Sequence, residues 1–318
     1  MNPLLAERVL LPRRIGPRAG RSRLLTSGVF ALLLCGPGSG VQAREESSSE
    51  SPATQLHTKR VELHPRLRAN AFGEPLVLIS RELPGRMEGD VYADVAHPFT
   101  AVGDAFRSAA GICELLFMHL NVRSCTPSSG TDGERLTLVA GSKRSTGFAM
   151  QDSISYVMRS EIADATHLRV TLSAAQGPLS TRDYLMVFEA VPIDAGHSFV
   201  HFGYSYAYGT LARMAMGSYL AMAGRAKIGF TVEGQDVNGR PKYVQGVRAA
   251  IERNVMRYYL ALQARLSITT GSPDERNQAR LRAWFALTER HAAQLHEYDI
   301  DEYLQEKRRD LARMAAGT

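Results

Sequence analysis

The chain has 318 residues, with 44% hydrophobic and 22% charged side chains and a formal net charge of +6. This length is sufficient for one large domain or two small ones. Most of the positive charge comes from the first 43 residues, so the excess does not indicate a surface for nucleic acid. We therefore expect no nucleic-acid partner.

Residues 1–43 have the layout of a cleavable signal peptide. A basic lead precedes the short apolar run "LLTSGVFALLLC" (24–35), and Val41 and Ala43 stand at the −3 and −1 positions of a cut after Ala43. Twelve residues are too few to span a bilayer, which needs about 20. We expect a periplasmic or secreted protein with no transmembrane segment after cleavage, an uncleaved anchor being the alternative. Cleavage would lower the net charge from +6 to +1.

Two cysteines, Cys113 and Cys125, lie beyond this segment. In an oxidising compartment such a pair is a disulfide candidate. The spacing alone does not decide between a bond and two separate thiols, one of them buried.

The N-terminal part of the mature chain begins with a Ser-rich, unpatterned stretch. We interpret residues 44–60 as a disordered linker and 61–85 as an N-terminal extension that contains a strand. A second strand, "EGDVYADV", follows a turn at Pro84-Gly85-Arg86. Apolar residues then recur at steps of three and four over 97–120, which predicts helix, divided in two at Gly111.

After the turn cluster "SGTDGE" (129–134) the pattern is that of strands. Five segments are separated by Gly, Pro or Asp, at 135–144, 153–162, 167–175, 183–191 and 198–209. Short strands with turn-rich connections favour an antiparallel sheet.

The C-terminal third returns to helical spacing. Residues 210–226 have a Met-rich face (Met214, Met216, Met222), and Asn238-Gly239 is a strong hairpin signal. The clearest amphipathic helix covers 244–266. The tail, 267–318, is helical but too polar to form its own core, so we expect it to pack on the main domain or to form a homodimer with a second copy.

The segment "HFGYSYAYG" (201–209) alternates strictly between large and small residues. Phe202, Tyr204, Tyr206 and Tyr208 share one face of a strand, whereas the opposite face has only small side chains after His201. Such a row of rings either fills a core or lines a pocket.

The order of elements over 86–266 resembles the START-like, or SRPBCC, superfamily, which includes polyketide cyclases and lipid-transfer domains. "GDVYADVAHPFTAVGDAF" resembles its opening strand and first short helix, and "YVQGVRAAIERNVMRYYLALQARL" its closing helix. The resemblance implies an α+β helix-grip fold, in which a curved antiparallel sheet wraps around the long C-terminal helix and a ligand cavity lies between them. It makes Phe202, Tyr204, Tyr206, Tyr208 and Tyr258 the expected cavity lining.

The sequence offers little support for a serine nucleophile, a metal site or an acid/base pair. Gly203-Tyr-Ser205-Tyr-Ala207 lacks the sharp turn of a nucleophile elbow, because the strand alternation continues through it. His197 and His201 would lie about 13 Å apart on a strand, too far to share a metal ion. We expect no metal and no cofactor. Arg159, Glu161 and Asp183 could act as inward acid/base groups, but strand charges are more often solvated, and His119 is more often a packing histidine.

These observations favour an exported binding or carrier protein for a hydrophobic small molecule or lipid, rather than an enzyme. Two alternatives remain open: a polyketide cyclase-like enzyme, and an interaction module whose core is filled by side chains.

Overall fold

A computed structural model describes residues 50–131, 133–141, 152–209 and 227–316. The predicted signal peptide and the Met-rich segment 210–226 lie outside these residues. Ten strands are described: β1 Leu76–Leu83, β2 Arg86–Val95, β3 Val122–Gly130, β4 Gly133–Ala140, β5 Asp152–Asp164, β6 His167–Gln176, β7 Thr181–Pro192, β8 Ser198–Tyr208, β9 Val232–Gln235 and β10 Pro241–Tyr243. The α-helices are α1 Pro52–Arg68, α2 Phe99–Phe106, α3 Ala109–Phe117, α5 Gly246–Ser267, α6 Pro273–Glu289, α7 Ala292–Leu295 and α8 Ile300–Ala316, with a 3-10 turn η2 at Pro178–Ser180.

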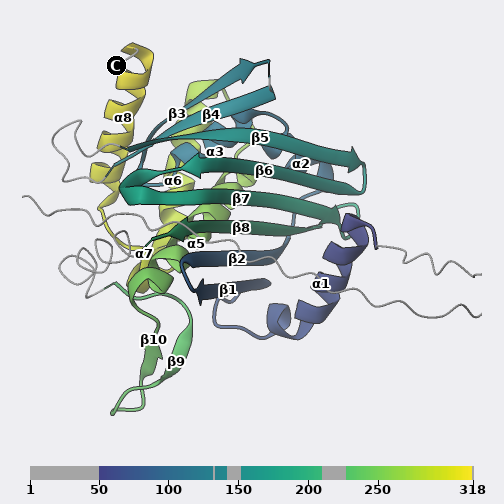
Figure 1. Cartoon of the computed structure of the whole chain (residues 1–318), viewed down its shortest axis with the longest axis vertical. Helices are drawn as coiled ribbons and strands as arrows, with labels where there is room; N and C mark the ends of the chain where they lie inside the picture. Colours follow the sequence, from purple (N-terminus) through teal and green to yellow (C-terminus); the bar gives the residue numbers. More distant parts are fainter. Residues whose placement is uncertain (1–49, 132, 142–151, 210–226, 317–318) are drawn as a thin grey trace, which may run out of the picture. The chain divides into compact units, whose positions relative to one another are not determined.

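Eight strands form one antiparallel sheet in the order β1-β2-β8-β7-β6-β5-β4-β3 (Figure 1). Alternate residues of β2 are buried, which follows from the period of two along a strand. One face, here called the inner face, packs against α5. The opposite face, here called the outer face, carries α1. This curved sheet on a long helix confirms the predicted α+β helix-grip class.

The helix α5 lies close to β2 because of a glycine. A Cβ built at Gly89 would lie 3.1 Å from side-chain carbons of Ile251 and Val255. Both of these α5 side chains are fully buried. A larger residue at 89 would therefore push the helix away from the sheet.

A buried carboxylate fixes the N-terminal half of α5. Glu252 is fully buried and accepts hydrogen bonds from Ser80 Oγ (2.5 Å), from the backbone N–H groups of Phe230 and Thr231 (2.6 and 2.9 Å) and from Thr231 Oγ1 (2.6 Å). Burying a charge without such partners would be costly. This carboxylate therefore joins α5 to β1 and to the segment before the β9–β10 hairpin, whose turn has Gly239 at φ +76°, as Asn-Gly predicts.

The prediction of a disordered linker over 44–60 is wrong for residues 52–60, which belong to α1. Ser51 caps this helix by accepting from Thr54 N at 3.2 Å. Three leucines, Leu56, Leu63 and Leu67, are buried on the outer face against a small cluster that includes Val77, Val191 and Phe199. The sequence did not predict this helix because most of its residues are polar. Only the three leucines are buried, and the surface that buries them belongs to the sheet.

Two further expectations about 97–130 require correction. The break between α2 and α3 falls at Arg107–Ser108, where Ser108 Oγ caps α3 by accepting from Gly111 N, so Gly111 lies inside α3. The Ser- and Pro-containing segment 122–130 was not predicted as a strand, but it forms β3 at the edge of the sheet. Cys113 of α3 and Cys125 of β3 are joined by a disulfide.

The C-terminal tail packs on the main domain, one of the two expected arrangements. Trp284 Nε1 donates to the carbonyl of Arg257 in α5 at 2.9 Å, and Tyr303 OH donates to the carbonyl of Met118 at 2.7 Å. Lys307 is buried and donates to the carbonyls of His119 and Val122 at 2.8 and 2.7 Å. The apolar side chains of the tail are thus part of the same core as the sheet and α5. None of the described helices is both long enough and apolar enough to cross a membrane.

Candidate ligand-binding site

The rings of β8 face α5. The ring centroid of Tyr258, on α5, lies 5.5 Å from that of Phe202 and 6.4 Å from that of Tyr204, with edge-to-face geometry in both pairs. Tyr204 and Tyr206 follow along the strand at 5.8 Å from each other. Phe202 is buried and packs on Phe188 at 4.9 Å, so it belongs to the core of the domain.

Two tyrosines that the sequence analysis did not single out join this group. Tyr184 of β7 stacks on Tyr206 at 5.5 Å and lies 6.2 Å from Tyr204, and Tyr156 of β5 meets Tyr184 edge to face at 6.4 Å. Their strands alternate in the same way as β8, which was the available signal. We call the five residues Tyr156, Tyr184, Tyr204, Tyr206 and Tyr258 the tyrosine cluster.

The cluster is not closed like an ordinary core. Tyr156, Tyr184 and Tyr258 are buried, whereas Tyr204 and Tyr206 remain half-buried although they point towards α5. Tyr184 OH lies 2.7 Å from Thr181 Oγ1. Among the residues that the structure describes, the hydroxyls of Tyr204, Tyr206 and Tyr258 have no hydrogen-bond partner. Native cores rarely leave polar groups unpaired, so these hydroxyls are available to water or to a guest molecule.

Burial keeps these phenols protonated. Desolvation raises the pKa of Tyr204 and Tyr156 well above the ordinary value, and it raises the pKa of Tyr206 and Tyr258 as well. Neighbouring tyrosines add to this shift for each of the four. The hydroxyls can therefore donate hydrogen bonds to an acceptor oxygen at any physiological pH.

Tyr208, the last of the expected lining residues, lies at the end of β8 beside Tyr206. Its ring centroid is 6.2 Å from that of Tyr206, and its hydroxyl donates to Glu82 Oε1 at 3.3 Å. It is buried and already paired. The structure thus brings together Tyr204, Tyr206 and Tyr258, whose hydroxyls have no partner among the described residues. Phe202 and Tyr208 are supporting side chains beside them.

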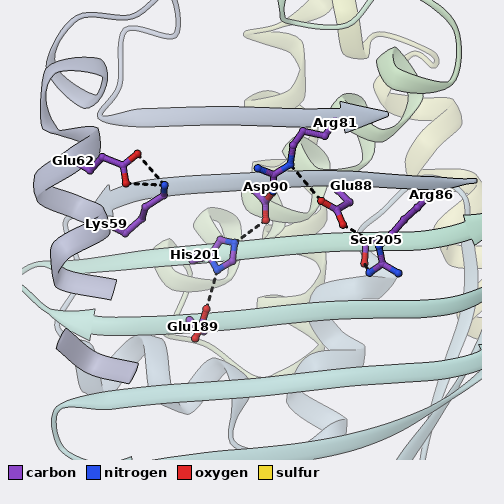
Figure 2. Close-up of polar contacts among 9 residues, drawn as sticks. All are labelled: Lys59, Glu62, Arg81, Arg86, Glu88, Asp90, Glu189, His201 and Ser205. Atoms are coloured by element: carbon purple, nitrogen blue, oxygen red, sulfur yellow. Dashed lines mark hydrogen bonds and ion pairs between the residues drawn. The ribbon is translucent and has the colours of Figure 1, made fainter. Parts of the chain in front are cut away.

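The small side chains of β8 lie on the outer face of the sheet. His201 lies between two carboxylates there, with Nε2 at 2.9 Å from Asp90 Oδ1 and Nδ1 at 2.9 Å from Glu189 Oε2 (Figure 2). A Cβ at Gly203 would come within 3.0 Å of Asp90 Oδ1. The glycine therefore leaves room for the His201–Asp90 pair.

His201 belongs to a row of charges of alternating sign that crosses six strands, β1, β2, β8, β7, β6 and β5. Asp90 Oδ2 lies 3.7 Å from Arg81 Nη2 on β1, and Glu189 Oε1 lies 2.6 Å from Arg169 Nη1 on β6. The row ends at Glu161 on β5, whose Oε2 is 3.9 Å from Arg169 Nε. Burial disfavours the charged imidazole, but the hydrogen bonds to the two carboxylates outweigh it and raise the pKa of His201.

The acid/base candidates do not lie on the inner face. Arg159, Glu161 and Asp183 are exposed, and Arg159 and Glu161 alternate with the inward-facing Tyr156 and Met158 along β5. His119 is buried against Tyr258, with ring centroids 4.8 Å apart, and its Nδ1 accepts from Asn121 N at 3.1 Å. Desolvation, helped by Arg257 and Lys307, lowers the pKa of His119, so the ring is neutral. Over the described ranges, no group of three or more His, Cys, Asp or Glu side chains could hold a metal ion.

A pocket of about 460 Å³ lies elsewhere, at the end of the sheet where β2 runs into α2. Phe99 and Gly103 of α2 line it, together with Arg107 at the C-terminal end of this helix, Leu168 and residues of the β7–β8 turn. None of the expected lining residues borders this pocket.

Two short helices, α2 and α3, follow β2, the antiparallel strands come next, and α5 closes the domain against their inner face. This arrangement, an antiparallel sheet curved around a long helix, is a helix-grip fold.

No family model and no curated protein matches the chain. Among solved structures, the chain is similar to a fragment of the STAR-related lipid transfer protein from Xanthomonas axonopodis, with 12% identity and a TM-score of 0.36 over 60% of this chain and 98% of that one. It is also similar to the Zhui aromatase/cyclase from Streptomyces (10% identity, TM-score 0.31, 65% and 96% coverage) and to human StAR-related lipid transfer protein 5 (10%, 0.31, 54% and 90%).

Proposed function

We propose that the chain is an exported carrier that binds a hydrophobic small molecule or lipid at the tyrosine cluster. One observation supports this most directly: Tyr204 and Tyr206 face α5 but remain half-buried, and their hydroxyls are unpaired within the described residues. A close-packed interior would cover such rings and pair such hydroxyls.

The chemistry of the cluster defines the ligand class. Five aromatic rings offer apolar surface, and burial of apolar ligand area stabilises a complex by about 25 cal/mol per Å². Protonated phenols donate hydrogen bonds, so they orient a ligand that has one or two acceptor oxygens. The expected guest is therefore largely apolar, with a carbonyl, ether or hydroxyl oxygen near Tyr204 and Tyr206.

The test is retention of ligand by the purified protein. After incubation with a lipid extract and removal of free lipid, native mass spectrometry of the wild type should show a discrete added mass. The double variant Tyr204→Phe/Tyr206→Phe keeps both rings and should retain several-fold less of the same species. If the wild type retains nothing from such an extract, the carrier proposal is wrong.

That negative result would favour the interaction module with a filled core. In that case the expected partner is a second copy held by the C-terminal tail, and sizing chromatography of the full chain would show a dimer. An enzyme of the cyclase type has less support, because the two carboxylates at the described inner face, Glu82 and Glu252, already accept hydrogen bonds from Tyr208 and from Ser80. The His119 ring beside Tyr258 is neutral.

Export is part of the proposal and has its own test. Expressed with its native N-terminus in a bacterium that exports proteins, the mature protein should have an intact mass that begins at Arg44. Its recovery from the cytoplasm with residues 1–43 still attached would contradict export.

A further inference from the structure

The second feature that could bind a ligand is the pocket of about 460 Å³ beside α2. Its walls come from the first turns of α2 and from the β5–β6 and β7–β8 turns. The volume lies within the range of small-molecule sites. No residue of the tyrosine cluster lines it, and Tyr206 and Tyr208 lie towards the other end of β8.

The wall of this pocket includes a glycine of α2, Gly103. Gly103 lies within the helix, where glycine is unfavourable relative to alanine. A Cβ at this position would meet no atom within 4 Å, so packing does not require a glycine here. Its effect on the structure is to leave space at the pocket wall.

The lining combines an apolar floor with one accessible cation. Phe99 is half-buried and Pro98 is exposed, so both present apolar surface to the pocket, whereas Leu168 is almost fully buried. The Arg107 guanidinium is exposed, and its ion pair with Asp104, 2.9 Å away on the same helix, is exposed too. Exposed pairs of this kind contribute little and exchange readily. Arg107 is therefore free to turn to a ligand.

The one carboxylate in the lining is already occupied. Asp194 Oδ1 accepts from Gly196 N at 2.8 Å and lies 2.9 Å from His197 Nδ1. These hydrogen bonds keep Asp194 within its own turn. An anionic group would therefore lie on the α2 side of the pocket, at Arg107, away from Asp194.

We propose that this pocket is a second binding site, separate from the tyrosine cluster, for a small amphipathic anion. The apolar part of the ligand, a ring system or a short chain, lies on Phe99 and Pro98, and its acidic group pairs with Arg107. The inference goes beyond the carrier function, because it needs no ligand at the tyrosine cluster.

Two fluorescent probes with the same skeleton test it. 8-Anilinonaphthalene-1-sulfonate carries an acidic group that N-phenyl-1-naphthylamine lacks. The wild type should bind the sulfonate more tightly than the neutral probe. Gly103→Trp, which fills the pocket, should weaken binding of both probes at least tenfold, whereas Gly103→Ala should leave both within about twofold.

Arg107→Gln separates the two parts of the proposal. It should weaken binding of the sulfonate at least fivefold and leave the neutral probe nearly unchanged. The double variant Tyr204→Phe/Tyr206→Phe should leave binding of both probes at this pocket unchanged. If Gly103→Trp does not fold, Ala195→Trp fills the same pocket from the exposed β7–β8 turn. Unchanged binding in the folded Trp variant, or equal loss of both probes in Arg107→Gln, would overturn the proposal.

Discussion

His201 Nε2 and Asp90 Oδ1 are 2.9 Å apart on the outer face of the sheet, where the two strands β8 and β2 are neighbours. The other ring nitrogen of His201 meets Glu189, and the ring stacks on Tyr92 at 4.3 Å with an interplanar angle of 5°. An imidazole between two carboxylates donates to both only when it is protonated. In its protonated form, which the raised pKa favours, His201 therefore cross-links three strands, β2, β8 and β7.

The first prediction concerns pH. The folded state raises the pKa of His201, so its contribution is fully present below the unfolded value of about 6.5 and is lost as pH rises through the folded pKa. His201→Gln should lower the free energy of unfolding by about 2 kcal/mol at pH 6, and this difference should shrink towards pH 9. Urea unfolding at several pH values measures it.

His197→Gln is the matched control, because His197 pairs with Asp194 in an exposed turn instead of within the sheet. Its effect should stay within about 0.5 kcal/mol at every pH. A constant difference between wild type and His201→Gln from pH 6 to 9 would show that His201 is not charged in the folded protein.

The second prediction concerns the space above Gly203. A side chain at this position meets Asp90 Oδ1, so Gly203→Val should displace Asp90 from His201 and destabilise the protein by about 1 to 3 kcal/mol. It should also reduce the pH dependence of stability described above. Gly209→Ala, at a nearby glycine where a Cβ meets no atom within 4 Å, should be nearly neutral. Wild-type stability in Gly203→Val would contradict the close approach.

The third prediction compares the hydroxyls of Tyr204 and Tyr206, which have no partner among the described residues, with that of Tyr184, which is hydrogen-bonded. Tyr184→Phe removes the hydroxyl that bonds Thr181, and it should cost about 1 kcal/mol. Tyr204→Phe and Tyr206→Phe remove hydroxyls without a partner in the described residues, so each should change stability by less than about 0.5 kcal/mol while it weakens ligand retention. Thermal unfolding of the ligand-free proteins measures these differences. A cost at Tyr204 equal to that at Tyr184 would indicate a filled, paired core.

The fourth prediction concerns the disulfide between α3 and β3. Cys113 and Cys125 are separated by 12 positions in sequence, so the bond closes a short loop. On the chain-entropy model, Cys125→Ser should lower the free energy of unfolding by about 3 kcal/mol. Reductant should destabilise the wild type similarly and leave the variant unaffected. If reductant has no effect on the wild type, the bond does not contribute to stability.

Much of the fold could be predicted from the sequence because the responsible forces act locally. The alternation in β5 to β8, the Asn238-Gly239 turn and the amphipathic spacing of α5 each lie within one short segment. The sequence did not predict α1 and β3, because the contacts that stabilise these two elements come from other parts of the chain. Three leucines of α1 pack on the outer face of the sheet, which stabilises the helix. Pairing with β4 makes residues 122–130 a strand. Neither partner lies within the segment itself.

In the candidate site, too, contacts within one strand could be predicted, whereas contacts between strands could not. That Phe202, Tyr204, Tyr206 and Tyr208 share one side of β8 follows from the residue order alone, because the side-chain period of a strand allows no other arrangement. That Tyr184 and Tyr156 join them, and that the small side chains of β8 accommodate the His201–Asp90 pair, follows from the packing of the strands into a sheet. These contacts link residues on different strands, and their geometry depends on sheet order and register, which a single strand does not encode.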